Sequence, residues 1–242
     1  MNTYFNIIYE FDKQEVHRAI EAAQKGYICV VDGVVLSTAN RQPDYLKVVN
    51  GSLFSICDSS WVPVYVNSIY GIKYEQYCGA EIFKDIILSR KYKMLFMGTS
   101  QSILDRLKTE LTKMNPDVAN MQFVELPFKK AEEFDYPEIA KMVNSDGAKI
   151  IWVALGAPKQ ERFMSLLLPH LNQGVMIGVG AAFKFYSGME EKRCPAWIQK
   201  IHLEFLYRVF QDPKKQLKRC YWIVRTLPRL YLEERRRAKV GR

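Results

Sequence analysis

Apolar runs alternate with amphipathic stretches along the central part of the chain, from about residue 53 to residue 180. Short apolar runs are typical of buried strands, and apolar residues at every third or fourth position are typical of helices. Their alternation predicts a mostly parallel sheet covered by helices. The expected strands are 28–31, 34–36, 54–57, 62–66, 93–97, 121–124, 149–155 and 175–179, and the expected helices are 43–50, 80–90, 101–114, 131–144 and 159–171.

Two of the expected strands end in turns that contain glycine. The strand 149–155 breaks at Gly156 and a helix opens at Lys159, while the strand 175–179 runs into a second turn. In open, Rossmann-like α/β sheets, ligands bind in the crevice outside the carboxyl ends of the strands. We therefore predict a ligand site, with Gly156, Pro158, Lys159, Gln160, Glu161, Gly178 and Gly180 as its candidate residues.

A third glycine, Gly98, follows the strand 93–97 and leads into a helix. The first amides of such a helix can hold a phosphate. Gly178 and Gly180 superficially resemble a dinucleotide fingerprint, but the third glycine of that motif is missing and no clear helix is expected after them. The pair is therefore only weak evidence for a nicotinamide cofactor.

Polar residues follow two further expected strands. Thr38 and Asn40 come after the run 34–36, where such residues commonly cap the next helix. Asp58 leaves the strand 54–57, where an aspartate is commonly a turn residue. The alternative for all three is a site at the same rim, with Asp58 as a base, and the residues alone leave both interpretations open.

The positive charge is concentrated at the carboxyl end. Residues 192–242 hold 15 lysines and arginines against 4 acidic residues, a net charge of +11, whereas residues 1–191 hold 20 against 22, a net charge of −2. A basic end of this kind binds phosphate on nucleic acid, on an anionic membrane or on a substrate, or is a solvated tail. We divide the chain into an α/β core, 1–194, and a basic helical appendage, 195–242.

The appendage has the pattern of amphipathic helices. Ile198, Ile201, Phe205 and Val209 recur on one helical face, and a second helix is expected after Asp212, with Pro228 kinking or ending it. Its aromatic and aliphatic groups beside cations suit a helix lying on an anionic membrane. Packing against the core is an equally good interpretation.

Other features favour a cytosolic protein. The five cysteines are an odd number without a closely spaced pair, as expected of reduced thiols. The first ten residues lack a secretory signal pattern, and no stretch approaches the roughly 18 apolar residues of a membrane span. Contact with a membrane is therefore expected at its cytosolic surface. No recognised nucleic-acid-binding motif accompanies the charge.

The short motifs also occur in a characteristic order: Thr38-Ala-Asn40, Asp58, Gly79, Met97-Gly98, Gly156-Ala-Pro-Lys-Gln-Glu161, Gly178-Val-Gly180, Phe183, Gly188, Arg193-Cys-Pro-Ala-Trp197, Glu204-Phe-Leu-Tyr-Arg208 and Pro213. In this ordered series the chain resembles the WecG/TagA/CpsF glycosyltransferases, bacterial enzymes of cell-surface polymer synthesis, over most of its length.

The resemblance implies an inverting transfer from a UDP-sugar, typically of the N-acetylmannosamine type, to a polyprenyl-diphosphate-linked N-acetylglucosamine. It implies that Asp58 is the general base, that Thr38 and Asn40 share its pocket, and that Gln160 belongs to the nucleotide end. It also implies that appendage arginines meet the lipid diphosphate and that the appendage draws the enzyme to the membrane. The candidate arginines are Arg193, Arg208 and Arg219. Another UDP-hexose or uronic acid donor is an alternative, a nucleic-acid-binding protein is a weaker one, and a homo-oligomer is left open.

No D-x-D or H-x-x-H pair suggests a metal site, so a departing diphosphate is expected to rely on cations and helix N-termini. Three positions depart from the family pattern. Ser59 replaces a usual glycine, Gln76 a common arginine, and Lys184 a common acidic residue. These departures leave the donor sugar open.

Overall fold

The computed structural model describes residues 1–22, 25–189 and 213–240. Its centre is an eight-stranded sheet in the order β1-β2-β4-β3-β8-β7-β5-β6. β1 pairs with β2 in antiparallel fashion, and the other neighbouring pairs are parallel. The strands are β1 (Asn2–Tyr4), β2 (Ile7–Tyr9), β3 (Gly26–Val31), β4 (Phe54–Cys57), β5 (Met94–Gly98), β6 (Gln122–Val124), β7 (Ile150–Ala154) and β8 (Val175–Gly178). The predicted α/β class with a mostly parallel sheet is thereby confirmed.

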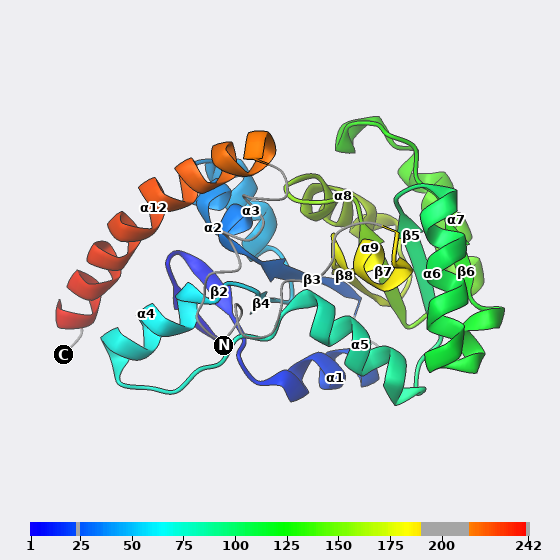
Figure 1. Cartoon of the computed structure of the whole chain (residues 1–242), viewed down its shortest axis with the longest axis horizontal. Coiled ribbons are helices and arrows are strands. Elements are labelled where there is room, and N and C mark those ends of the chain that lie inside the picture. Colours follow the sequence, from blue (N-terminus) through cyan, green and yellow to red (C-terminus); the bar gives the residue numbers. More distant parts are fainter. Residues whose placement is uncertain (23–24, 190–212, 241–242) are drawn as a thin grey trace.

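Helices cover both faces of this sheet (Figure 1). One face carries α2 (Gly33–Ala39), α3 (Pro43–Asn50), α4 (Trp61–Tyr70), α7 (Tyr136–Asp146), α8 (Lys159–Leu167) and the long α12 (Pro213–Val240). The other face carries α1 (Lys13–Glu21), α5 (Gly79–Ser89), α6 (Gln101–Met114) and α9 (Ala182–Ser187). Three 3₁₀ turns complete the described elements: η1 (Pro116–Asn120), η2 (Ala131–Glu133) and η3 (Leu168–His170).

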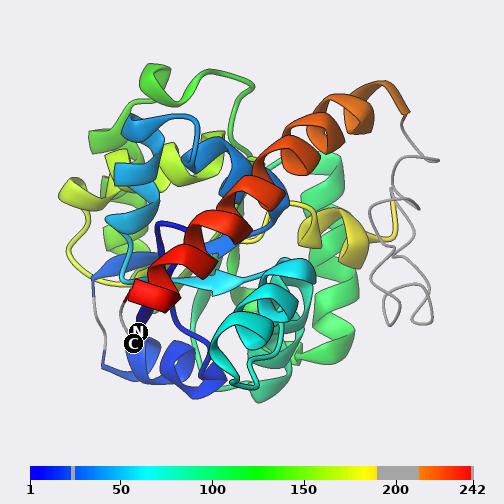
Figure 2. The ribbon, with the colours of Figure 1, turned by 90° about the vertical axis from the view of Figure 1, so that its left-hand side faces the viewer.

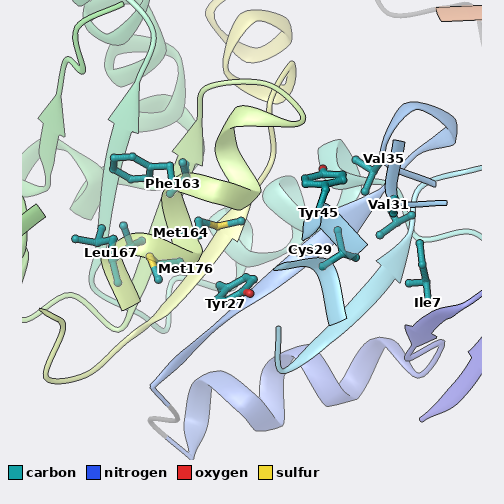
Figure 3. Packing of buried hydrophobic residues seen from close by; sticks show 14 of the residues in the cluster. Ile7, Tyr27, Cys29, Val31, Val35, Tyr45, Phe163, Met164, Leu167 and Met176 are labelled. Carbon is teal, nitrogen blue, oxygen red and sulfur yellow. The ribbon is translucent and has the colours of Figure 1, made fainter. Parts of the chain in front are cut away.

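The strands alternate their side chains between two apolar layers, because successive residues of a strand point to opposite faces. In β3, Cys29 and Val31 join the layer under α3 and α8, while Ile28 and Val30 join the layer under α5 and α6. Figure 3 shows the first layer, where Tyr45 of α3 lies near Cys29. All six residues of β3 are buried, as expected of a central parallel strand.

Two expected strands are helices instead. The run 34–36 lies in α2, because Asp32 caps this helix by accepting hydrogen bonds from the amides of Val34 and Val35, both at 2.8 Å. The run 62–66 lies in α4, where Val62 and Val66 are fully buried one helical turn apart. Short runs of valine look like strands in a sequence, and here tertiary packing decides otherwise.

Several boundaries also differ from the expected ones. The expected helix 131–144 is divided into η2 and α7, since Asp135 caps α7 through the amide of Glu138. A short helix, α9, follows Gly180 although none was expected. β1, β2 and α1 were not anticipated, and the expected helix 198–209 lies outside the described residues.

The helix α12 continues through Pro228 to Val240, so Pro228 does not end it, and a kink at this proline stays a prediction. Pro228 and Val224, the residue four positions earlier, are both exposed. Water can therefore solvate the carbonyl group that a proline leaves without its helical partner.

One face of α12 packs on the core. Figure 2 shows α12 crossing that side of the molecule. Leu227 and Leu230 are buried in the apolar layer that contains α2 and α4, and Ile223 lies against Gly33. The carboxylate of Glu234 is also buried, and it accepts hydrogen bonds from the amide of Phe5 at 3.0 Å and the hydroxyl of Tyr70 at 2.7 Å.

Replacing Leu230 by alanine should therefore lower the free energy of unfolding by about 2 to 5 kcal/mol, the usual effect of opening a cavity in a core. Leu232→Ala on the exposed face of the same helix is the control and should change it by less than about 0.5 kcal/mol. Urea denaturation measures both. Equal effects of the two substitutions would show that α12 does not pack on the core in solution.

Candidate active site

The carboxyl ends of the parallel strands lie along one edge of the sheet. Asp32 follows β3, Asp58 follows β4, and Gly98, Ala154 and Gly178 end β5, β7 and β8. The chain then leaves neighbouring strands in opposite directions, because α6 covers one face of the sheet and α8 the other. Such a change of direction opens a crevice at the strand ends, the usual ligand site of this architecture.

Two glycines shape the loops at this edge. Gly98 has a φ of +120°, and a Cβ atom on it would lie 2.5 Å from the carbonyl oxygen of Ala154 in β7. Gly156 has a φ of +75° in open surroundings. Both conformations favour glycine, and the tight passage at Gly98 also excludes any side chain. The predicted glycine turns therefore lie together, next to the N-terminus of α6.

Gln160 joins the ends of β7 and β8. Its side-chain oxygen accepts from the amide of Gly156 at 3.2 Å, and its side-chain nitrogen donates to the carboxylate of Glu161 at 2.9 Å. A Cβ atom on Gly178 would lie 3.0 Å from the Gln160 nitrogen, and Gly180 borders the same side chain. Gln160 is 4 % exposed, so its amide is held inside the wall of the crevice.

Glu161 is a fully buried carboxyl group in the same wall. It accepts from Gln160 through one oxygen and from the hydroxyl of Tyr45 through the other, at 2.9 Å. The pKa of Glu161 is raised to about 7, mainly by burial and also by the charge of Asp32, while hydrogen bonds from Gln160, from the backbone and from Tyr45 oppose the rise. In this structure both carboxylate oxygens of Glu161 contact groups of the protein interior, and its contact with a substrate stays a prediction.

Asp58 is half-buried and its backbone is fixed on both sides. Its amide donates to the carbonyl of Val31 at 3.0 Å, and its carbonyl accepts from the side-chain nitrogen of Gln76 at 3.0 Å. The amide of Tyr77, the residue after Gln76, donates to the carbonyl of Cys57 at 3.0 Å. Gln76 thus supports the strand end at Asp58, a contact that the sequence did not indicate. Ser59, the neighbouring departure from the family pattern, is buried.

Thr38 and Asn40 do not cap the following helix. Thr38 is buried within α2, and Asn40 ends this helix. The Asn40 amide donates to the carbonyls of Phe5 and Leu36 at 3.1 and 3.0 Å, and its oxygen accepts from Asn6 at 2.8 Å. Asn40 therefore holds the turn between β1 and β2 in place.

The loop after β6 lies beside the start of α8 (Figure 1). The Lys159 ammonium group donates to the carbonyl of Lys129 at 2.8 Å and lies 5.1 Å from the ring centre of Phe128 and 5.6 Å from that of Phe134. Burial lowers the pKa of Lys159. Phe128 is fully exposed, and no sequence motif marked it as a site residue.

The helix α12 also covers the helix that carries Thr38. The Arg41 guanidinium lies 4.0 Å from the ring centre of Trp222 and donates to the carbonyl of Ser37 at 3.1 Å.

Of the arginines predicted to meet the lipid diphosphate, Arg219 is half-buried on α12, whereas Arg193 and Arg208 lie outside the described residues. Lys184, the third departure, lies within α9.

Two further properties concern metals and membranes. Within residues 1–22, 25–189 and 213–240, no group of three or more His, Cys, Asp and Glu residues could hold a metal ion. In the same part of the chain, every helix is either too short or too polar to cross a membrane.

The raised pKa of Glu161 predicts a pH dependence of stability. The folded pKa, about 7, exceeds the ordinary glutamate value of 4.5, so the contribution of Glu161 is complete below about pH 4.5 and is lost as the pH rises through about 7. Glu161→Gln cannot titrate, and its amide can keep both contacts because the Tyr45 hydroxyl can also accept. The free energy of unfolding of the wild type should therefore fall relative to Glu161→Gln by about 3 kcal/mol between pH 4.5 and 8.

Urea denaturation across this pH range measures the difference. Glu138→Gln, a substitution of an exposed residue of α7, is the control and should track the wild type at each pH. A constant difference between the wild type and Glu161→Gln at every pH would contradict the assignment.

Comparisons with known proteins agree with the ordered motifs. The model of the glycosyl transferase WecG/TagA/CpsF family matches residues 8–240. An N-acetylglucosaminyldiphosphoundecaprenol N-acetyl-beta-D-mannosaminyltransferase of Bacillus subtilis (strain 168) is 26 % identical over 204 residues, which are 80 % of this chain and 78 % of that protein. A protein of the same name from Bacillus spizizenii is 23 % identical over 218 residues, 85 % of this chain and 82 % of that protein.

The family match covers almost the whole chain, both relatives are glycosyltransferases by name, and the sheet edge carries the glycine turns that the resemblance emphasised. The predicted resemblance is thereby confirmed: the chain belongs to the WecG/TagA/CpsF family of glycosyl transferases.

Proposed function

We propose that the protein transfers an N-acetylmannosamine-type sugar from a UDP-sugar to a polyprenyl-diphosphate-linked N-acetylglucosamine, with inversion at the transferred carbon. The names of the two Bacillus relatives support the acceptor and the sugar. The observation that carries the proposal is the edge formed by the carboxyl ends of the parallel strands, where Asp58 follows β4 and glycine turns lie at the ends of β5 and β7.

Asp58 is the proposed general base. Inversion needs one direct displacement, with the acceptor hydroxyl attacking from the side opposite UDP. The hydroxyl oxygen forms the new bond to the anomeric carbon, its proton passes to the Asp58 carboxylate, and the bond electrons leave with UDP. Gln76 is a positioning residue in this scheme, because it holds the Asp58 carbonyl. Thr38 is assigned to the same pocket.

The departing diphosphate gains negative charge, and fixed positive groups stabilise it. The first amides of α6 open beside Gly98, and the Ser100 side chain does not cap them. Arg193, Arg208 and Arg219 are the proposed cations on the lipid side. We propose that no metal ion is needed. Activity in excess EDTA tests this part, and a rate restored only by a divalent ion would refute it.

Asp58→Asn should lower kcat by about 10²-fold to 10⁴-fold, since general base catalysis contributes roughly this factor. Asp117→Asn in the exposed η1 segment is the matched control and should keep the wild-type rate. Release of UDP from UDP-N-acetylmannosamine, with a polyprenyl-diphosphate N-acetylglucosamine analogue as the acceptor, measures both rates. An undiminished rate for Asp58→Asn would remove the base assignment.

Phe128 is the proposed stacking surface for the nucleobase. It is exposed at the strand-end side of the sheet and is attached to α8 through the contacts of Lys159. Phe128→Ala should raise KM for the UDP-sugar by about tenfold, because stacking of a base on an aromatic ring is worth about 1 to 3 kcal/mol. Leu88→Ala on the exposed side of α5 is the control. An unchanged KM, measured by steady-state kinetics, would exclude this role.

The outer face of α12 is the proposed membrane-binding surface. Leu217, Tyr221, Val224 and Leu232 are exposed along it, with the exposed cations Arg225, Arg229, Arg235 and Arg236 beside them. Apolar groups beside cations suit the boundary between acyl chains and acidic headgroups. The inner face of the same helix packs on the core, so both interpretations of the appendage apply to α12, one to each face.

A further inference from the structure

A hollow of about 300 Å³ lies between α4 and the last turns of α12, remote in sequence from the glycine turns. Its lining residues are Ser68, Ile69, Tyr231, Arg235, Ala238 and Lys239. This volume is at the lower end of the range for small-molecule sites. The lining combines two cations with two hydroxyl groups, which is the chemistry that binds phosphate oxygens.

The two cations of this hollow have no acidic partner in the described part of the chain. Arg235 and Lys239 are one helical turn apart, and neither forms an ion pair with a described residue. Two other arginines of α12 are paired, since Arg229 contacts Glu233 at 2.7 Å and Arg237 contacts Glu234 at 3.7 Å. The hollow therefore presents positive charge that an anion can neutralise.

The walls of the hollow are held by contacts on its inner side. The rings of Tyr65 and Tyr231 pack with their centres 5.1 Å apart, and the Tyr70 hydroxyl donates to Glu234 at 2.7 Å. Both contacts join α4 to α12. Binding an anion there would not require ordering of these two helices, which favours affinity.

The hollow adjoins the exposed face of α12. Val224, Pro228, Leu232, Arg235 and Lys239 follow one another at steps of three or four residues, so all of them lie on one side of the helix. Apolar groups occupy the earlier turns of this face, and the cations of the hollow occupy its last turns. A phospholipid whose acyl chains lie near the apolar turns would bring its headgroup to the hollow.

We propose that the hollow between α4 and α12 binds the phosphate of an acidic phospholipid headgroup and thereby sets the orientation of the protein on the membrane. This inference rests on the proposed membrane-binding role of α12. Arg235 and Lys239 neutralise the phosphate, and the hydroxyls of Ser68 and Tyr231 donate to its oxygens. None of its lining residues is among the cations proposed for the lipid-linked substrate.

Ser68→Gln tests the hollow without changing the charge, because the longer polar side chain fills it. Ser68 is exposed on α4, so the fold should tolerate the substitution. Flotation with phosphatidylcholine vesicles that contain phosphatidylglycerol should show binding weakened by about tenfold, the usual effect of losing charged hydrogen bonds. Ser145→Gln on the exposed surface of α7 is the control and should bind as the wild type does. Equal binding by Ser68→Gln and the wild type would overturn the proposal.

A charge-matched pair separates a site from a diffuse attraction. The double variant Arg235→Ala, Lys239→Ala and the double variant Arg225→Ala, Arg236→Ala each remove two exposed cations of α12. A defined site predicts that the first variant binds the anionic vesicles more weakly than the second. Equal losses would mean that only the overall charge matters and would overturn the site.

The glycosyl transfer assay distinguishes this inference from the proposed function. With a short-chain, water-soluble acceptor analogue and no vesicles, Ser68→Gln should keep the wild-type kcat and KM. Lack of transfer by the wild type would refute the proposed function, whereas normal transfer with unaltered vesicle binding by Ser68→Gln would refute the headgroup site alone.

Discussion

The buried carboxyl group of Glu161 is the contact on which the sheet edge depends. It holds Tyr45 of α3 with one oxygen and Gln160 with the other, and Gln160 in turn holds Gly156 and fills the space beside Gly178. Two helices and two strand ends are thus joined through one side chain. Burial of a carboxyl group is unfavourable unless it is hydrogen-bonded, which explains why both oxygens have donors. This interior network therefore holds the wall of the crevice beside the glycine turns.

The helix α12 combines two environments that the sequence could not separate. Leu227, Leu230 and Glu234 are buried against the core, while Leu217 and Val224 remain exposed. The composition of such a helix reads equally well as a packed helix or as a membrane-bound one, because both need an apolar stripe. Its contacts with α2 and α4 show that one stripe packs on the core, and membrane binding by the opposite stripe stays a proposal. Because α12 packs in the same apolar layer as the core helices, the boundary near residue 195 marks a change in net charge more clearly than a boundary between separately packed domains.

The long buried strands could be predicted because a strand covered on both faces is apolar throughout, as in β7. β1 and β2 could not be predicted, because three residues are too few for a periodic pattern. The valine runs of α2 and α4 were predicted as strands because valine is common in strands. At the site, the glycine turns were predictable because their backbone conformations and tight passages exclude most side chains. The partners of Glu161 and Asp58 could not be predicted. Tyr45 lies 116 residues from Glu161 in the sequence, and Gln76 contacts Asp58 because of the course of an irregular loop.

The turn between β1 and β2 is held from two distant parts of the chain. Asn40 binds the carbonyl of Phe5, and Glu234 binds the amide of the same residue, which lies 229 positions earlier. Phe5 and Asn6 both have a positive φ, a conformation that residues other than glycine rarely adopt without support. Both contacts join residues that are far apart in the sequence, 35 positions for Asn40 and 229 positions for Glu234. The backbone conformation of this turn therefore depends on α12, and a chain that stops short of residue 234 lacks one of its two supports.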